Sequence, residues 1–178
     1  PTLLRRAGVR AAAVAGLAER ALAAGAREIH LQTYAETADQ IMVEGDTLAR
    51  LGAMRVVIKI PATAAGYQAA RWLADSGRRV TLTAVYTVRQ VVLAQAVGAA
   101  YVAVYLGRVR DAGGDPLALV GAMQAAIRGM SAPLAILAAS VRDPAEIEPL
   151  AALGVATVTL PPAVLAGLLD SPATATAA

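Results

Sequence analysis

The chain has 178 residues, 57% of them hydrophobic, with a formal net charge of +3 and no cysteine. This length suits one domain with a sizeable core, and the lack of cysteine excludes disulfides and Cys-based zinc sites. Scattered arginines and an aromatic content of only 3% argue against a nucleic-acid partner. With no long uninterrupted apolar run and no signal-peptide pattern, we expect no membrane partner and a cytoplasmic location.

The predicted elements alternate between helix and strand along the whole chain. In chain order they are helix 8–24, strand 28–34, helix 37–51, strand 56–60, a helix capped by Thr63, strand 80–85, helix 87–97, strand 101–105, a polar Gly-rich loop 107–116, helix 117–130, strand 132–139, helix 143–153, strand 155–160 and helix 161–169. Six strands, each flanked by helices, predict an α/β fold with parallel strands in a single domain, residues 1–178.

This pattern leaves two architectures open, an open doubly wound sheet and a closed (β/α)₈ TIM barrel. Neither a dinucleotide fingerprint nor a phosphate-cradling Walker loop is present. A nucleotide-binding module is therefore the weakest of the functional interpretations.

Polar side chains occur late in the predicted strands, where ligands bind in parallel α/β folds. They supply an amide, an amine, a phenol, a guanidinium and hydroxyls: Gln32, Lys59, Thr83, Tyr105, Arg108 and Ser140.

Lys59 is the most specific of these residues. It is the only lysine among 16 Lys and Arg residues, and it lies between Ile58 and Ile60 in an apolar strand. Apolar surroundings disfavour an ammonium, and an uncharged amine can attack a ketone to form a Schiff base. The alternative is a lysine that reaches from a strand end to water or pairs with a carboxylate. Both interpretations fit the pattern, although arginine would serve the second equally well.

The other candidates each have a structural alternative. Tyr105 is either a general acid or base or an aromatic side chain at the rim of the fold. Arg108 is either a phosphate ligand or a loop salt-bridge partner, and Ser140 either contributes to phosphate binding or caps the following helix. We interpret His30 as structural. The acidic residues of the loop, Asp111 and Asp115, are interpreted as turn residues, and we expect no metal site.

Five motifs, in order and at matching spacing, resemble the transaldolase family, and are most similar to its fructose-6-phosphate aldolase-like subfamily. They are Val57–Thr63, Thr83–Tyr86, Tyr101–Arg108, Leu137–Ser140 and Thr159–Pro161. The resemblance implies a (β/α)₈ TIM barrel of the class I aldolase type. It also aligns Pro1 with the proline that follows the second strand of that barrel. We therefore expect the family's first two strands, with their aspartate and asparagine, and its C-terminal helix to lie outside residues 1–178.

The resemblance also implies roles for individual residues. Lys59 matches the Schiff-base lysine, and Thr83 matches an active-site threonine near it. Tyr105 and Gln32 match the aldolase subgroup, whereas transaldolases usually carry phenylalanine and glutamate at these positions. Arg108 and Ser140 match the pair of residues that holds the substrate phosphate.

The implied function is a class I aldolase that cleaves or forms a C–C bond in a sugar phosphate, as in fructose 6-phosphate to dihydroxyacetone plus glyceraldehyde 3-phosphate. An alternative is a transaldolase that passes the dihydroxyacetone unit to an aldose phosphate. A second alternative is an inactive barrel that only binds sugar phosphates. The resemblance further implies no cofactor and a homo-oligomeric ring.

Overall fold

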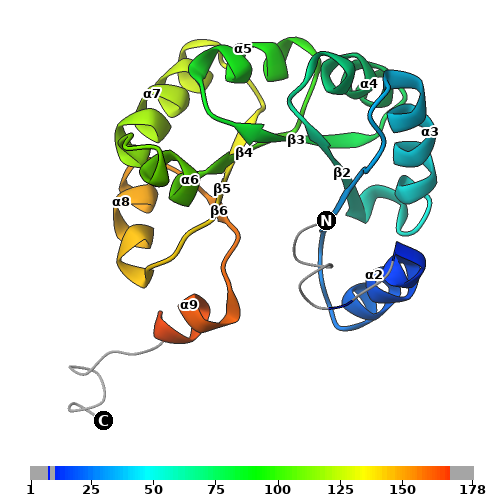
Figure 1. The fold of residues 1–178 in the computed structure, drawn as a ribbon, viewed down its shortest axis with the longest axis horizontal. Coiled ribbons are helices and arrows are strands. Elements are labelled where there is room, and N and C mark those ends of the chain that lie inside the picture. The colour runs from blue at the N-terminus through cyan, green and yellow to red at the C-terminus, as the bar shows by residue number, and fades with distance from the viewer. Residues whose placement is uncertain (1–7, 9–10, 169–178) are drawn as a thin grey trace. The chain divides into compact units, whose positions relative to one another are not determined.

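The computed structural model describes residues 8 and 11–168, along which helices and strands alternate as in an α/β protein (Figure 1). The strands are β1 (Ile29–Gln32), β2 (Val56–Pro61), β3 (Arg79–Val85), β4 (Tyr101–Tyr105), β5 (Ala135–Ala139) and β6 (Thr157–Val158). The α-helices are α2 (Val14–Ala23), α3 (Ala38–Ala49), α4 (Ala64–Asp75), α5 (Val88–Ala96), α6 (Leu106–Asp111), α7 (Pro116–Gly129), α8 (Ile147–Ala152) and α9 (Pro162–Gly167). Short 3-10 helices are η1 (Ala11–Ala13), η2 (Ala53–Arg55) and η3 (Pro144–Glu146).

The chain divides into two compact units, and each is described by itself. Unit 1 comprises residues 1–83 and 93–101, and unit 2 comprises residues 84–92 and 102–178. Hydrogen-bonded strands follow chain order. Unit 1 contains β1, β2, β3 as far as Thr83, and Tyr101 at the start of β4; unit 2 contains the rest of β4, β5 and β6. The β1–β2, β2–β3 and β5–β6 pairs are parallel. The α/β class and the parallel pairing are thus confirmed, whereas closure into an eight-stranded barrel stays a prediction.

Side-chain caps fix where three of the helices begin. The hydroxyl of Thr37 accepts from the backbone N–H of Gln40 at the start of α3, and the hydroxyl of Thr63 accepts from Gly66 at the start of α4. Asp115 accepts from the first turn of α7, which also begins with a proline. Each cap satisfies an N–H that has no partner within its helix. The predicted capping role of Thr63 is confirmed.

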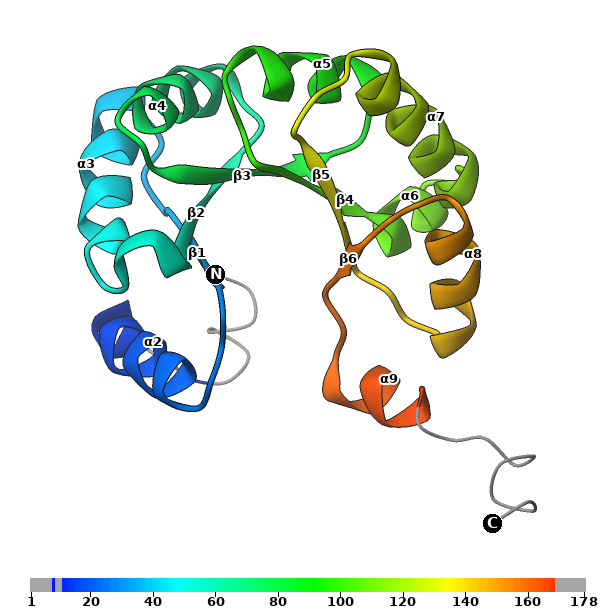
Figure 2. The ribbon, with the colours of Figure 1, turned by 180° about the vertical axis from the view of Figure 1, so that it is seen from behind.

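In unit 1, α3 and α4 pack side by side against β2, as both views show (Figures 1 and 2). Glycines permit this close approach. A Cβ on Gly45 of α3 would lie 2.8 Å from the Leu73 side chain of α4 and 3.2 Å from Ile58 of β2. A Cβ on Gly66 would lie 1.9 Å from the carbonyl oxygen of Pro61. Ile58 and Ile60, both fully buried, therefore face the helices.

The alternation of strand side chains then places Lys59 on the other face of β2. Val57 shares that face with Lys59, since the two residues are separated by one position in a regular strand. The helices thus cover one face of β2, and the opposite face carries the candidate amine.

In unit 2, the segment 107–116 differs from its prediction as a loop. Residues Leu106–Asp111 form α6, which contacts both β5 and α7. Leu106 is fully buried, so packing stabilises a short helix that its glycine and charged residues do not predict locally. A loop connects α6 to α7, and within it Gly113 has a positive φ of 78°.

Three strands are shorter than predicted: β1, predicted as 28–34, β5, predicted as 132–139, and β6, predicted as 155–160. Pro133 precedes β5, and proline, which has no N–H to donate to the hydrogen-bond ladder, disfavours an earlier start of that strand. Pro1 and the tail from residue 169 lie outside the described residues. No helix within the described part of the chain combines the length and apolarity needed to cross a bilayer.

Candidate functional site

Lys59 lies near the carboxyl end of β2 in a row of side chains that crosses unit 1. Strand pairing sets Lys59 beside Gln32 of β1 and beside Thr81 of β3. Residues paired in a parallel sheet point to the same face, so these three side chains share the face that the helices do not cover. Lys59 is partly exposed there, and Thr81 is fully buried.

Thr83 lies one row closer to the carboxyl edge of the sheet. It pairs with Pro61, and its carbonyl accepts a hydrogen bond of 2.9 Å from the backbone N–H of Ala62. The Thr83 side chain is 2% exposed. The next residue, Ala84, has a φ of 59°, in the left-handed region that non-glycine residues rarely adopt. Such backbone strain is concentrated at functional sites.

His30 lies one row below Lys59, next to Val57, and it belongs to a polar network that the sequence did not predict. Its Nε2 is 2.8 Å from a carboxylate oxygen of Glu28, and its Nδ1 is 2.8 Å from the hydroxyl of Thr81. Glu28 also accepts from Arg79, the residue of β3 in the same row as His30. His30 thus has specific partners on β3 as well as on its own segment.

Tyr101 completes the network on β4. Its hydroxyl is 3.0 Å from a guanidinium nitrogen of Arg79, and its ring lies 5.1 Å from the His30 ring, centroid to centroid. Period-two spacing from Lys59 along the neighbouring strands could have identified Thr81 and Arg79, whereas the partnership with Tyr101 depends on the folded arrangement.

Burial and hydrogen bonding shift the pKa values of Glu28 and His30 in this network. Burial would raise the pKa of Glu28, but hydrogen bonds from His30 and Arg79 hold it below its ordinary 4.5. Burial lowers the pKa of His30 below its ordinary 6.5, and Glu28 opposes this shift. The positive charges of Lys59 and Arg79 lower the pKa of His30 further. At neutral pH the network therefore contains a carboxylate and an uncharged imidazole.

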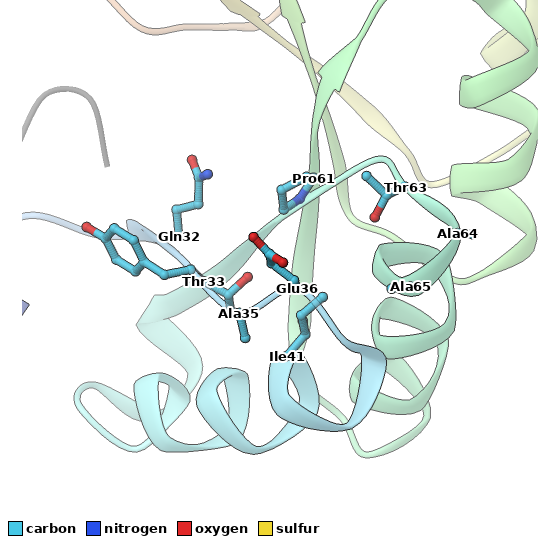
Figure 3. A pocket seen from close by; sticks show the side chains of 10 residues that line it. Gln32, Thr33, Ala35, Glu36, Ile41, Pro61, Thr63, Ala64 and Ala65 are labelled. Carbon is cyan, nitrogen blue, oxygen red and sulfur yellow. The ribbon is translucent and has the colours of Figure 1, made fainter.

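A cavity of about 490 Å³ opens beside this row, where β1 and β2 lead into α3 and α4. Figure 3 shows Gln32 pointing away from Ile41, with the Glu36 carboxylate between them. Thr63 at the start of α4 lines another side. The hydroxyl of Thr33, which also lines the cavity, is buried and makes no hydrogen bond to the described residues. The lining combines apolar carbons with a few polar groups, as small-molecule pockets do.

In unit 2, Tyr105 ends β4 and packs against Tyr86 edge to face, with ring centroids 6.2 Å apart. Arg108 lies in α6 with an exposed side chain. Ser140 directly follows β5 and has a φ of 61°. This left-handed conformation fixes the direction in which the chain leaves the strand.

Ser140 lies against the first turn of α6. A Cβ on Gly107 would come within 2.6 Å of the Ser140 hydroxyl and also within 2.6 Å of Nε of Arg142. Arg142 forms two hydrogen bonds, of 2.6 and 2.7 Å, with the carboxylate of Asp111. Arg142 is therefore a second cation near Ser140 that the sequence did not predict, and glycine at position 107 leaves room for it.

The structure assigns the predicted residues to two groups. Gln32, Lys59 and Thr83 belong to unit 1, where they occupy adjacent positions on one sheet face. Tyr105, Arg108 and Ser140 belong to unit 2, at the ends of β4 and β5 and in α6. The two loop acids differ in role. Asp115 is a helix cap, and Asp111 is a salt-bridge partner.

Comparison with known proteins identifies the family. The family model described as transaldolase/fructose-6-phosphate aldolase matches residues 3–178. A probable transaldolase of Caulobacter vibrioides is 36% identical over 146 residues, covering 82% of this chain and 67% of the relative. A probable transaldolase of Thermus thermophilus is 35% identical over 182 residues, covering 98% of this chain and 80% of the relative.

The chain covers 64% of the length of a probable transaldolase of Cereibacter sphaeroides and 67% of that of the Caulobacter relative. It therefore spans about two thirds of the length of these curated relatives. Among solved structures, a mandelate oxidase variant superposes with a TM-score of 0.58 at 16% identity, over 81% of this chain and 52% of the other. That likeness concerns the fold alone. The match of the family model over nearly the whole chain, together with these relatives, shows that the chain belongs to the transaldolase/fructose-6-phosphate aldolase family.

Proposed function

We propose that the protein is a class I aldolase that cleaves or forms a C–C bond in a sugar phosphate, with Lys59 as the amine that forms the Schiff base. One observation carries the proposal. The only lysine of the 178 residues lies near the carboxyl end of a parallel strand, on the face that the helices leave uncovered, beside Gln32. Ligands bind at this end of the strands in parallel α/β folds.

The proposed reaction begins when the uncharged amine of Lys59 adds to the ketone carbon of fructose 6-phosphate. Loss of water gives an iminium, which accepts the electron pair of the adjacent C–C bond as that bond breaks. Glyceraldehyde 3-phosphate leaves, and an enamine of dihydroxyacetone remains on the lysine. Protonation of the enamine carbon and hydrolysis then release dihydroxyacetone and restore the amine.

The remaining residues take supporting roles in this proposal. Tyr105 accepts the hydroxyl proton during cleavage and returns it to the enamine. Gln32 and Thr83 orient a water molecule near Lys59. Arg108 and Ser140 hold the phosphate through charge-assisted hydrogen bonds. The family resemblance supports all of these roles, and the placement of Gln32 and Thr83 near Lys59 in unit 1 agrees with theirs.

A transaldolase is the second candidate, and the names of the relatives favour it. In that reaction the enamine on Lys59 attacks an aldose phosphate instead of being protonated and released as dihydroxyacetone. Gln32 and Tyr105 favour the aldolase, since the resemblance implies glutamate and phenylalanine at these positions in transaldolases. An inactive barrel that only binds sugar phosphates is the third candidate.

Borohydride trapping tests the proposal. The full-length protein is incubated with fructose 6-phosphate, reduced, digested and analysed by mass spectrometry. We expect an adduct on the peptide that contains Lys59, and none in the Lys59→Arg variant, which keeps the positive charge but cannot form an imine. A folded protein that gives no adduct but still binds fructose 6-phosphate would support the inactive barrel instead.

A second measurement separates the two enzymes. Release of free dihydroxyacetone from fructose 6-phosphate without any acceptor indicates an aldolase. Turnover that requires an added aldose phosphate, such as erythrose 4-phosphate, indicates a transaldolase.

A further inference from the structure

The turn that follows β1 is held at three successive backbone N–H groups. The N–H of Thr33 donates to the backbone carbonyl oxygen of Lys59 over 3.0 Å, which continues the pairing of β1 with β2. The next two N–H groups, those of Tyr34 and Ala35, both donate to Oε2 of Glu44 in α3, over 2.9 and 3.0 Å. The backbone of β2 and a single carboxylate oxygen therefore fix the direction in which the chain leaves β1.

The helix segment that carries Glu44 is itself held firmly, because the next residue packs closely against two other elements. A Cβ on Gly45 would lie 2.8 Å from the Leu73 side chain of α4 and 3.2 Å from Ile58 of β2. Ile58 directly precedes Lys59. The helix that supplies the carboxylate is thus in contact with the strand that carries the candidate amine.

Glu44 reaches Gln32 through the main chain. The Gln32 side chain points away from Ile41 of α3 (Figure 3), and strand pairing sets Gln32 beside Lys59. The direction of a side chain at a strand end depends on the backbone that follows it, which here is the turn 33–35. Hydrogen bonds from backbone N–H groups to a carboxylate are stronger than those to a neutral oxygen, so the two bonds to Glu44 restrain this backbone effectively. The same turn lines the cavity of unit 1.

We propose that Glu44 is a positioning residue, which holds the turn 33–35 and thereby keeps the Gln32 side chain in place beside Lys59 for the Schiff-base reaction. The catalytic part of this inference rests on the proposed function, in which Gln32 orients a water molecule. The restraint on the turn does not rest on it, since it follows from the two hydrogen bonds to Glu44.

Asp46, on the same helix, provides a matched control. Like Glu44 it is a half-buried carboxylate, but its hydrogen bonds go to Arg50 and Arg78, over 2.6 and 2.7 Å. Asp46→Ala therefore weakens the attachment of α3 without removing the two bonds to the turn. Any effect that Glu44→Ala shares with Asp46→Ala reports on the stability of unit 1 instead of on the position of Gln32.

The first experiment examines the turn without any substrate. Hydrogen exchange of the Tyr34 and Ala35 N–H groups is followed by NMR in the full-length protein. Exchange should be about 10-fold or more faster in Glu44→Ala than in the wild type. Glu44→Gln, whose amide oxygen can still accept, should keep most of the protection, and Asp46→Ala should keep all of it.

The same spectra report on Gln32. The order parameter of its side-chain amide should fall in Glu44→Ala and stay at the wild-type value in Asp46→Ala. Either an unchanged exchange rate of the two N–H groups or an unchanged Gln32 order parameter in Glu44→Ala would overturn the inference.

The second experiment asks whether the restraint affects the reaction. Cleavage of fructose 6-phosphate is measured with and without erythrose 4-phosphate, so that an aldolase and a transaldolase would both turn over. In Glu44→Ala, kcat per folded protein should fall about 10- to 100-fold, the effect of a misplaced positioning group. KM should change little, because the proposed phosphate ligands, Arg108 and Ser140, belong to unit 2. Glu44→Gln should recover most of the lost kcat.

A double-mutant cycle separates positioning from a purely structural role. If Glu44 acts through Gln32, then Glu44→Ala should lower kcat far less in a Gln32→Ala background than in the wild type. An equal fold-loss in both backgrounds, or an equal loss in Asp46→Ala, would show that the carboxylate only stabilises the fold and would reject the positioning role.

The two experiments also distinguish this inference from the proposed function. No turnover and no Schiff-base adduct in the wild type, together with faster exchange and a lower Gln32 order parameter in Glu44→Ala, would reject the proposed function and retain the restraint on the turn. Wild-type turnover with an unchanged kcat in Glu44→Ala would retain the proposed function and reject the positioning role.

Discussion

Because the backbone at Ser140 is left-handed, we expect glycine to be more stable than alanine at this position, the reverse of the usual order. Ser140 follows β5 with a φ of 61° and carries the hydroxyl proposed to bind phosphate. A non-glycine residue in this region costs roughly 1–2 kcal/mol, since its Cβ approaches the following carbonyl. We propose that this strain is retained because a side chain at this position serves binding.

Two substitutions separate strain from binding. Ser140→Ala removes the hydroxyl and keeps the Cβ, whereas Ser140→Gly removes both. Elsewhere glycine is less stable than alanine by roughly 0.5–1 kcal/mol because of the entropy of the unfolded chain. At this φ the relief of strain outweighs that entropy, so Ser140→Gly should be the more stable variant by about 0.5–1 kcal/mol.

Both variants should bind phosphorylated substrates more weakly to the same degree. Loss of one hydrogen bond to a charged group costs roughly 1.5–3 kcal/mol, or about 10- to 150-fold in affinity. Urea unfolding of the full-length variants measures the first effect. The ratio of KM for fructose 6-phosphate to KM for unphosphorylated fructose measures the second. Ser140→Gly less stable than Ser140→Ala would refute the strain argument, and an unchanged KM ratio would refute the phosphate role.

Three further predictions concern the framework of the site. Gly66→Ala would place a Cβ 1.9 Å from the carbonyl oxygen of Pro61, so the urea midpoint should fall by the equivalent of about 3 kcal/mol or more. Asp115→Ala removes the cap of α7 and should cost about 1 kcal/mol in the same assay; Asp115→Asn, which keeps an acceptor, should cost less. Because the folded pKa of His30 lies below 6.5 and that of Glu28 below 4.5, the unfolded chain binds more protons in acid, and stability should decline as pH falls below about 6.5. His30→Gln should remove the upper part of this decline, and an unchanged curve would contradict the burial argument.

Local sequence patterns predicted most of the fold because, in most segments, the local preference for helix or strand agrees with the element that the segment forms. β4 was predicted with the bounds that the structure shows, and Thr63 was correctly predicted as a cap. α6 was missed because Gly107 and the charged residues around it favour a loop locally, while burial of Leu106 against the rest of unit 2 stabilises the helix. Tertiary packing outweighs local propensity in such short segments.

The candidate residues were identifiable from their strand-end positions, but their partners were not. The hydroxyl that bonds to His30 is 51 residues further along the chain, so its pairing depends on strand register. A lone histidine is reasonably interpreted as structural. Glu28 lies only two residues before it, whereas the partnership with Thr81 is revealed only by the folded arrangement. Arg142 near Ser140 was hidden for the same reason, since Asp111 and Gly107, which fix its position, come from another element.

The charges around Lys59 also bear on the choice between aldolase and transaldolase. In its own row, Gln32 and Thr81 are uncharged, and in the row below the carboxylate of Glu28 is paired with Arg79. Neither neighbour of Lys59 in its own row is therefore a carboxylate. A glutamate in place of Gln32, which the family resemblance implies for transaldolases, would add such a charge beside the lysine and a second group able to transfer protons. Under the proposed function, the amide at position 32 leaves proton transfer to other side chains, and the family resemblance implies Tyr105 for that role.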